Sequence, residues 1–282
     1  MTFTAENGRP AGRIGQGTWY LGENRRTFAR ECEALRCGIE AGMTLIDTAE
    51  MYGEGAAETL VGRAVSGAER EGLFLVSKVY PFHAGRSHIF RACEDSLRRM
   101  GTEYLDLYLL HWRGSVPLAE TVECMEELKA RGLIRAWGVS NFDRADMEEL
   151  FSVPGGDRCA ANQVLYHLGS RGVEYDLLPW MQQHSVAMMA YCPLAQAGAL
   201  RRGLMDSPAV QAAAQAHGVS AAQVLLAFTL RQPGVVPIPR TGDPAHALDN
   251  AGAAGLVLTD AEFAALDAAF PAPDRPVPLD IV

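Results

Sequence analysis

The chain has 282 residues, 48% of them hydrophobic, and a formal net charge of −9, so it is long enough for one large domain with a sizeable core. Only Lys78 and Lys129 are lysines among its 25 basic residues, and the arginines are scattered, which argues against a nucleic-acid or anionic-membrane surface but allows a small anionic ligand. No apolar run approaches the roughly 20 residues of a membrane span, and the residues after Met1 lack the apolar core of a secretion signal. The six cysteines form no CxxC pair. We therefore expect a cytoplasmic protein with reduced thiols and no membrane partner.

Predicted strands and helices alternate along the chain. Apolar runs predict eight strands, over residues 14–18, 44–47, 73–78, 104–111, 134–140, 160–165, 186–191 and 235–238. Amphipathic spacing predicts helices between and after them, over residues 26–41, 56–65, 87–100, 117–131, 144–150, 174–183 and 244–254, with two adjacent helices across 208–231. A last helix over 260–270 begins at a capping-box pattern, Thr259 followed three residues later by Glu262.

Eight strand and helix units with no sign of a boundary predict an α/β fold, a single (β/α)8 TIM barrel over residues 1–282. We also expect an N-terminal hairpin, an extra C-terminal helix, and a proline-rich tail that lies extended over the surface. In such a barrel the carboxyl ends of the strands meet at one mouth, where barrel enzymes keep their chemistry. Polar residues close seven of the predicted strands: Asp47, Lys78, His111, Ser140 with Asn141, Asn162 with Gln163, Tyr191 and Arg240.

Four of the residues expected near the mouth, Asp47, Tyr52, Lys78 and His111, form a candidate catalytic group. An ammonium beside a phenol is expected to lower its pKa from about 10, and a carboxylate would hold that ammonium ionised. A histidine could hydrogen-bond a substrate oxygen or share the proton. This is equipment for protonating a carbonyl oxygen. The alternatives are a structural Asp–Lys ion pair with a core histidine, and a lyase or isomerase in which the lysine forms a Schiff base.

A second group of polar residues fits a nicotinamide ring. Ser140, Asn141 and Gln163 offer donors and acceptors for a carboxamide, and Tyr191 offers a flat face for stacking. The alternative is that Ser140 and Asn141 cap the following helix while Tyr191 belongs to the core.

The eighth strand is followed by Arg240 and Thr241, just before a helix expected to start near Pro244. A phosphate there could meet a cation, a hydroxyl and a helix N-terminus, although an exposed arginine beside a solvated cap remains the alternative. Trp19 and Trp112 adjoin strand ends, where a substrate wall and plain packing are equally compatible with the sequence. No HxH, HExxH or clustered Cys/His spacing predicts a metal site.

Seven segments match, in order, the pattern of one enzyme family: LIDTAEMYGEG, LFLVSKV, YLDLYLLHW, GVSNF, NQVLYH, YCPL and IPRT. From about Gly12 onward the chain resembles the aldo-keto reductases, barrel enzymes that reduce carbonyl groups with a nicotinamide cofactor and without a Rossmann domain. The resemblance implies that Tyr52 donates the proton, with Asp47, Lys78 and His111 in support. It also implies cofactor contacts from Gly17, Thr18, Ser140, Asn141, Gln163, Tyr191, Cys192, Leu194, Arg240, Thr241, His246 and Asn250.

Three positions in or beside the expected cofactor site depart from the family pattern. His246 stands where many relatives carry arginine, Asp249 where they carry glutamate, and Cys192 where serine is commoner. The resemblance therefore implies NADPH as the cofactor, with NADH as an alternative.

The resemblance is strongest to compact bacterial members that reduce methylglyoxal and other short aldehydes, through NQVLYHLGSRGVEYDLLPW and PLAQAG. The segment between His111 and Pro117 and the tail after Phe270 are short, whereas relatives with larger substrates close their pocket with long loops there. We expect an open pocket and a monomeric reductase of small aldehydes and α-oxoaldehydes. The alternative is a regulatory subunit of the same fold in which turnover is incidental.

Overall fold

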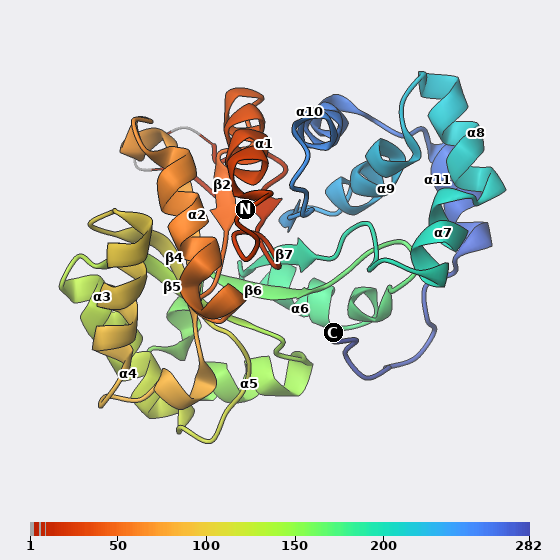
Figure 1. Cartoon of the computed structure of the whole chain (residues 1–282). Helices are drawn as coiled ribbons and strands as arrows, with labels where there is room; N and C mark the ends of the chain where they lie inside the picture. Colours follow the sequence, from red (N-terminus) through yellow and green to blue (C-terminus); the bar gives the residue numbers. More distant parts are fainter. Residues whose placement is uncertain (1–2, 6, 9) are drawn as a thin grey trace.

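Eight parallel strands form one curled sheet and are arranged in chain order (Figure 1). The computed structural model describes residues 3–5, 7–8 and 10–282. All the predicted strands are present, most of them a residue or two shorter than expected: β1 (Gln16–Gly17), β2 (Leu45–Asp47), β3 (Phe74–Val79), β4 (Leu105–Leu110), β5 (Ile134–Ser140), β6 (Ala161–Leu165), β7 (Ala187–Tyr191) and β8 (Val235–Pro237).

The first and last strands approach one another. The backbone N–H of Gly15 donates to the carbonyl oxygen of Pro237 at 2.9 Å, and that of Gly17 donates to Pro239 at 3.0 Å. This contact between the two ends of the sheet is consistent with the (β/α)8 architecture expected from the sequence. Before β1, one antiparallel bridge pairs Thr4 with Pro10; residues 6 and 9 of the expected hairpin lie outside the described residues.

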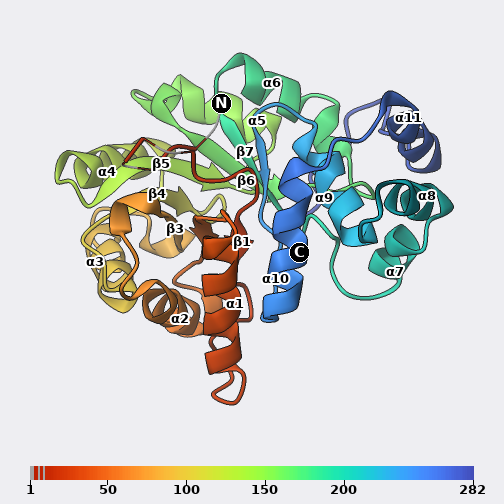
Figure 2. The ribbon, with the colours of Figure 1, turned by 90° about the horizontal axis from the view of Figure 1, so that it is seen from above.

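Most of the helices surround the sheet on its outer side, and some of those that follow β7 stand farther out (Figure 2). They are α1 (Phe28–Glu40), α2 (Ala56–Val65), α3 (Ile89–Met100), α4 (Leu118–Ala130), α5 (Arg144–Ser152), α6 (Leu177–Gln183), α7 (Ala199–Met205), α8 (Pro208–His217), α9 (Ala221–Leu230), α10 (Pro244–Gly252) and α11 (Asp260–Ala269). The predicted capping box of α11 is present, with Thr259 accepting from the N–H of Glu262 and Glu262 accepting in return. Among the described residues, no helix is both long and apolar enough to cross a membrane.

Helix α7 was not predicted from the sequence. It has seven residues, follows Gly198, contains Gly203 and buries only Leu204. A helix this short presents too few apolar positions for a 3.6-residue period to be recognised, and glycine further weakens the signal.

Apolar side chains pack in two layers, one between sheet and helices and one inside the curled sheet. Because successive strand residues point to opposite faces, Val76 of β3 points inward and Lys78, two residues on, shares that direction. Close strand pairing also depends on Gly138, where a Cβ would lie 2.3 Å from the carbonyl oxygen of Ala161. The absence of a side chain there lets β5 and β6 meet with Ser140 beside Gln163.

The C-terminal tail forms no helix or strand, as its prolines predict, but it does more than cover the surface. Leu279 packs against the core, and the Ser170 hydroxyl donates to Asp280 at 2.5 Å. Val282 then reaches the cavity at the mouth of the sheet. The tail therefore contributes to the wall of that cavity.

Candidate active site

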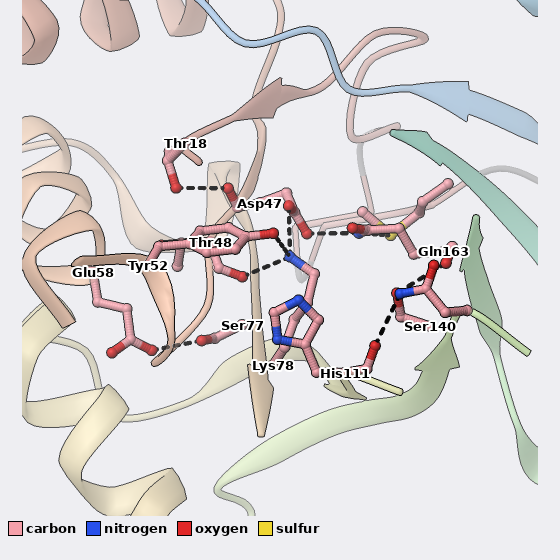
Figure 3. A network of polar contacts seen from close by, with 12 residues as sticks. Thr18, Asp47, Thr48, Tyr52, Glu58, Ser77, Lys78, His111, Ser140 and Gln163 are labelled. Carbon is pink, nitrogen blue, oxygen red and sulfur yellow. Dashed lines mark hydrogen bonds and ion pairs between the residues drawn. The ribbon is translucent and has the colours of Figure 1, made fainter. Parts of the chain in front are cut away.

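Lys78 stands at the centre of a buried polar network (Figure 3). Its Nζ donates to Asp47 Oδ2 at 2.7 Å, to the carbonyl oxygen of Thr48 at 2.9 Å and to the Tyr52 hydroxyl at 3.0 Å. An ammonium has three hydrogens, so all its donors are used. The lysine side chain is fully buried, and this leaves it inaccessible as a Schiff-base nucleophile.

Tyr52 reaches this network through a left-handed turn. The three residues after it, Gly53, Glu54 and Gly55, have φ values of 55°, 52° and 90°. Glycine adopts such angles without steric cost, so the two glycines permit the reversal that leads from β2 into α2. The turn leaves the Tyr52 hydroxyl above Lys78 at the carboxyl end of β3.

Burial dominates the electrostatics of this group. It raises the pKa of Asp47, against the lowering effect of Lys78 and of Gln163, and it lowers the pKa of Lys78, against the raising effect of Asp47. Burial and then the Asp47 charge raise the pKa of Tyr52 well above its usual value. The expected lowering of the phenol pKa is therefore wrong for this structure, because desolvation of a phenolate outweighs the nearby ammonium.

His111 lies beside Tyr52, with ring centroids 5.7 Å apart. Burial and the charge of Lys78 lower the pKa of His111 to about 2. Its imidazole is therefore neutral near pH 7. One ring nitrogen can donate a hydrogen bond and the other can accept one, but the ring does not carry an extra proton. Its buried Nδ1 has no hydrogen-bond partner among the described residues.

The predicted amide group is assembled around the β5 and β6 strand ends. The Ser140 hydroxyl and the backbone N–H of Asn141 both donate to the carbonyl oxygen of Gln163 at 2.9 Å. Asn141 has a φ of 58°, its Nδ2 donates to the carbonyl oxygen of His111 at 3.2 Å, and its Oδ1 accepts from the Tyr191 hydroxyl at 2.9 Å. The candidate catalytic group and the amide group are therefore in direct contact, through His111 and Asn141.

The helix-cap alternative for Ser140 and Asn141 is wrong. The cap of α5 is Asp143, which accepts from the N–H of Asp146 in a capping box. Asn162, which the sequence placed at the mouth beside Gln163, does not line the cavity. It is fully buried and supports the same loop, because its Nδ2 donates to the carbonyl oxygen of Phe142 at 2.8 Å.

At the other end of the mouth, α10 begins at Pro244 as predicted. Its cap is Asp243, which accepts from the N–H of Ala245 and pairs with Arg30 at 2.8 Å. Thr241 accepts from the Asp243 N–H at 3.0 Å. Arg240 is exposed and lines the cavity, so a guanidinium, a hydroxyl and a helix start stand together there.

One cavity of about 860 Å³ joins these groups. The predicted residues that line it are Gly17, Thr18, Trp19, Asp47, Tyr52, His111, Trp112, Ser140, Asn141, Gln163, Tyr191, Cys192, Leu194, Arg240, Thr241, His246 and Asn250. Of the predicted site residues only Lys78 is absent from the lining, because it lies fully buried behind Asp47 and Tyr52.

The sequence did not identify some of the residues that line the cavity. Arg201 belongs to the unpredicted helix α7, Val282 ends the tail, and Tyr20 and Met51 directly follow or precede predicted site residues. Only the last two had a signal, their position beside Trp19 and Tyr52.

Aromatic rings form one side of the mouth. Trp19 stacks on Tyr20 with centroids 4.6 Å apart, and Trp112 lies 4.9 Å from His111 and 5.9 Å edge-on from Tyr80. Both tryptophans therefore pack against neighbours and also line the cavity.

Comparison with known proteins gave concordant results. The sequence model of the aldo/keto reductase family matches residues 13–270. The methylglyoxal reductase YeaE of Escherichia coli is 56% identical over 282 residues, covering 100% of this chain and 98% of that protein. The glyoxal reductase of Bacillus subtilis is 34% identical over 84% of this chain and 82% of its own length.

A solved structure shows the same similarity. The aldo/keto reductase of Klebsiella pneumoniae, crystallised with NADP and acetate, is 54% identical, with a TM-score of 0.96 over 100% of this chain and 99% of that one. Another structure of an enzyme from that organism, in complex with NADPH, gives the same values. Within the described part of this chain, no three His, Cys, Asp or Glu side chains are grouped as a metal site would require.

Proposed function

Because the chain belongs to the aldo/keto reductase family, we propose that it reduces small aldehydes and α-oxoaldehydes, such as methylglyoxal, to alcohols with NADPH. The observation that carries this proposal is the Lys78 network, because its member Tyr52 lines the cavity together with His111. Full-length similarity to a methylglyoxal reductase supports the substrate class.

The cavity has the chemistry to hold NADPH, which supplies a hydride when bound. At one end, Gln163 and Asn141 offer amide groups and Tyr191 an aromatic face; at the other, Arg240 and Thr241 precede a helix N-terminus. The volume of about 860 Å³ is within the range of cofactor sites. We propose that the remaining cofactor contacts are those expected from the family, with Gly17, Thr18, Cys192, Leu194, His246 and Asn250 along the same cavity.

The side chains around Lys78 would move one proton. Tyr52 keeps its phenol proton at neutral pH, since its pKa is raised, and it donates that proton to a carbonyl oxygen as negative charge develops there. Lys78, at 3.0 Å from the phenol oxygen, stabilises the charge left on it. Asp47 keeps the lysine oriented, and neutral His111 can donate a second hydrogen bond to the substrate oxygen.

The finer architecture is part of the proposal. We propose a closed (β/α)8 barrel in one domain over residues 1–282, with the N-terminal hairpin and α11 as additions. The contacts of Gly15 and Gly17 with the β8 end of the sheet support closure. A monomeric, cytoplasmic protein acting on a small carbonyl substrate without a membrane or nucleic-acid partner completes the hypothesis.

A spectrophotometric assay tests the proposed reaction. Purified protein with NADPH and methylglyoxal should oxidise the cofactor with matched formation of the alcohol product, identified by mass spectrometry. Binding of NADPH without turnover on any short aldehyde would contradict the enzyme proposal and favour the regulatory subunit.

The same assay tests the choice of cofactor. Arg240 can hold a 2′-phosphate by two hydrogen bonds, so catalytic efficiency should be higher with NADPH than with NADH. Equal efficiencies with both cofactors from pH 8 to pH 6 would refute this assignment.

A further inference from the structure

Asp47 makes two strong contacts, and only one of them belongs to the proton network. Its Oδ2 accepts from Lys78 at 2.7 Å, while its Oδ1 accepts from Gln163 Nε2, also at 2.7 Å (Figure 3). Asp47 ends β2 and Gln163 lies in β6, so the contact crosses the mouth of the sheet. Both side chains are buried, each at about 2% exposure. One carboxylate therefore joins the lysine to an amide on the cavity wall.

This contact fixes which way the amide of Gln163 points. Its Nε2 carries two hydrogens; one is directed at Asp47, and the other faces the sulfur of Met189 at 3.8 Å. The reversed amide would place Oε1 against a carboxylate oxygen, where two acceptors repel. Oε1 has no donor among the described residues, and Gln163 lines the cavity. A ligand at this wall consequently meets an acceptor and not a donor.

We propose that Asp47 is a positioning residue for the cofactor: it holds Gln163 so that Oε1 accepts a hydrogen bond from the carboxamide N–H of the nicotinamide. This inference rests on the proposed function and deepens it. The carboxylate of Asp47 then has two roles: it forms the ion pair with Lys78, and it helps to select a cofactor that carries a carboxamide.

The Asp47→Asn variant separates the two duties because asparagine has one acceptor oxygen where aspartate has two. Lys78 and Gln163 must compete for it, and a buried ammonium needs it more than a neutral amide does. Gln163 then faces the new amide nitrogen, turns its own oxygen toward it, and presents its NH2 group to the cavity. The wall changes from an acceptor to a donor without a change in side-chain volume.

The test compares NADP⁺ with its 3-acetylpyridine analogue, in which a methyl group replaces the carboxamide NH2. Dissociation constants are measured by quenching of tryptophan fluorescence. The unmodified protein should bind NADP⁺ about three- to ten-fold more tightly than the analogue, the value of one hydrogen bond. In Asp47→Asn this ratio should fall to about one.

Two further variants keep the outcome decisive. Tyr52→Phe should lose turnover but keep the ratio, because it leaves Asp47 and Gln163 in place. Gln163→Glu should also keep the ratio, since the buried pair shares one proton and still turns an acceptor toward the cavity. Loss of the ratio in Gln163→Glu would show that the wall acts as a donor and would overturn the proposal, even if Asp47→Asn failed to fold.

Binding of 2′-phospho-ADP-ribose, which lacks the nicotinamide, is the control for folding and should be the same in all variants. An unchanged ratio in Asp47→Asn with normal binding of this control would overturn the inference while leaving the reductase proposal intact. Failure of the unmodified protein to bind either NADP⁺ or the control would instead contradict the proposed function itself.

Discussion

At Tyr52 burial raises the pKa of the phenol, which supports its proposed role as an acid and not a base. Burial keeps the phenol protonated, and Lys78 Nζ lies 3.0 Å from its oxygen, where we propose that the ammonium stabilises the charge left when the proton is transferred. We expect Tyr52→Phe to lower the turnover of methylglyoxal by about 100-fold or more, the range of positioned acid catalysis. The dissociation constant of NADPH should not change, because no predicted cofactor contact is removed. Full turnover in this variant would exclude the mechanism.

Lys78 is tested separately from Tyr52. Lys78→Met removes the charge that stabilises the phenolate and leaves Asp47 without its cation, so turnover should fall by a similar factor. Full activity in this variant would show that the ammonium has only a structural role. The comparison is made at saturating NADPH, so that weaker cofactor binding does not mimic a catalytic loss.

His111 predicts how folding stability depends on pH. Its pKa is lowered from about 6.5 to about 2, so between these values the unfolded chain binds a proton that the folded chain does not. Its contribution is complete above pH 6.5 and is lost as the pH falls. The unfolding free energy should drop by about 2 kcal/mol between pH 7 and pH 5 from this residue alone.

His111→Gln should remove that part of the pH dependence, measured by urea unfolding at each pH. The exposed His88 offers a control. His88→Gln leaves the buried His111 imidazole in place, so its unfolding free energy should depend on pH as in the parent protein. An unchanged slope in His111→Gln would show that the folded state accepts the proton at this position.

At the residue scale, the sequence predicted which groups face the cavity but not how they are connected. Strand-end position was sufficient to place Asp47, His111 and Gln163 at one mouth. The bond between Asp47 and Gln163 was not predictable, because the two residues are 116 positions apart and meet only through the curvature of the sheet. The predicted direction of the Tyr52 pKa shift was also wrong, because the depth of burial is a property of the folded chain.

At the scale of elements, the period of the apolar residues predicted every strand and most helices. What it missed was short or local. Helix α7 is too brief to show a period, and the cap of α5 is Asp143 instead of the Ser140 and Asn141 pair, because the chain first makes a left-handed turn at Asn141. A turn between strand and helix can shift the cap by two or three residues without any change in the hydrophobic pattern.

A charge pair with a buried carboxylate and a partly exposed guanidinium links three consecutive elements. Glu58 of α2 is fully buried and accepts from the Ser77 hydroxyl of β3 and from Arg99 Nε of α3, each at 2.5 Å. Arg99→Leu should destabilise the protein by about 3–5 kcal/mol, because it leaves a buried carboxylate unpaired. The Glu58→Leu/Arg99→Leu double variant should lose less than the sum of the single variants.

Urea unfolding measures these differences, provided that the dependence of the unfolding free energy on urea concentration is the same in each variant. Arg91→Leu, on the same helix but with its side chain 88% exposed, is the matched control and should change stability by less than about 0.5 kcal/mol. Additive losses in the double variant would mean that the two side chains do not stabilise one another.

At the scale of the whole molecule, the two ends of the cavity are built from distant parts of the chain. The β2 to β4 ends provide the proton network, while β8 and α10 provide the cation and the helix start, and the contact of β1 with β8 brings them together. The tail adds Val282 to the same wall. The tail's path could not be predicted, because a proline-rich segment without periodicity carries no signal for what it packs against.

The shape of the mouth leads to a prediction about substrate size. Trp19, whose ring centroid lies 6.4 Å from that of Tyr52, and Trp112 offer aromatic walls to the cavity, so we expect most binding energy to come from the carbonyl group and from aromatic contact. Methylglyoxal and activated aromatic aldehydes should be reduced far more efficiently than steroids or hexoses, with Michaelis constants nearer 1 mM than 1 µM, the weak end of common values.

Trp112→Ala should raise the Michaelis constant for aromatic aldehydes more than for methylglyoxal, because only an aromatic substrate uses the ring face. Steady-state kinetics with matched pairs of aliphatic and aromatic aldehydes measure this difference. More efficient turnover of a steroid ketone than of any short aldehyde would mean that the Val282 tail or helix α7 closes over large ligands.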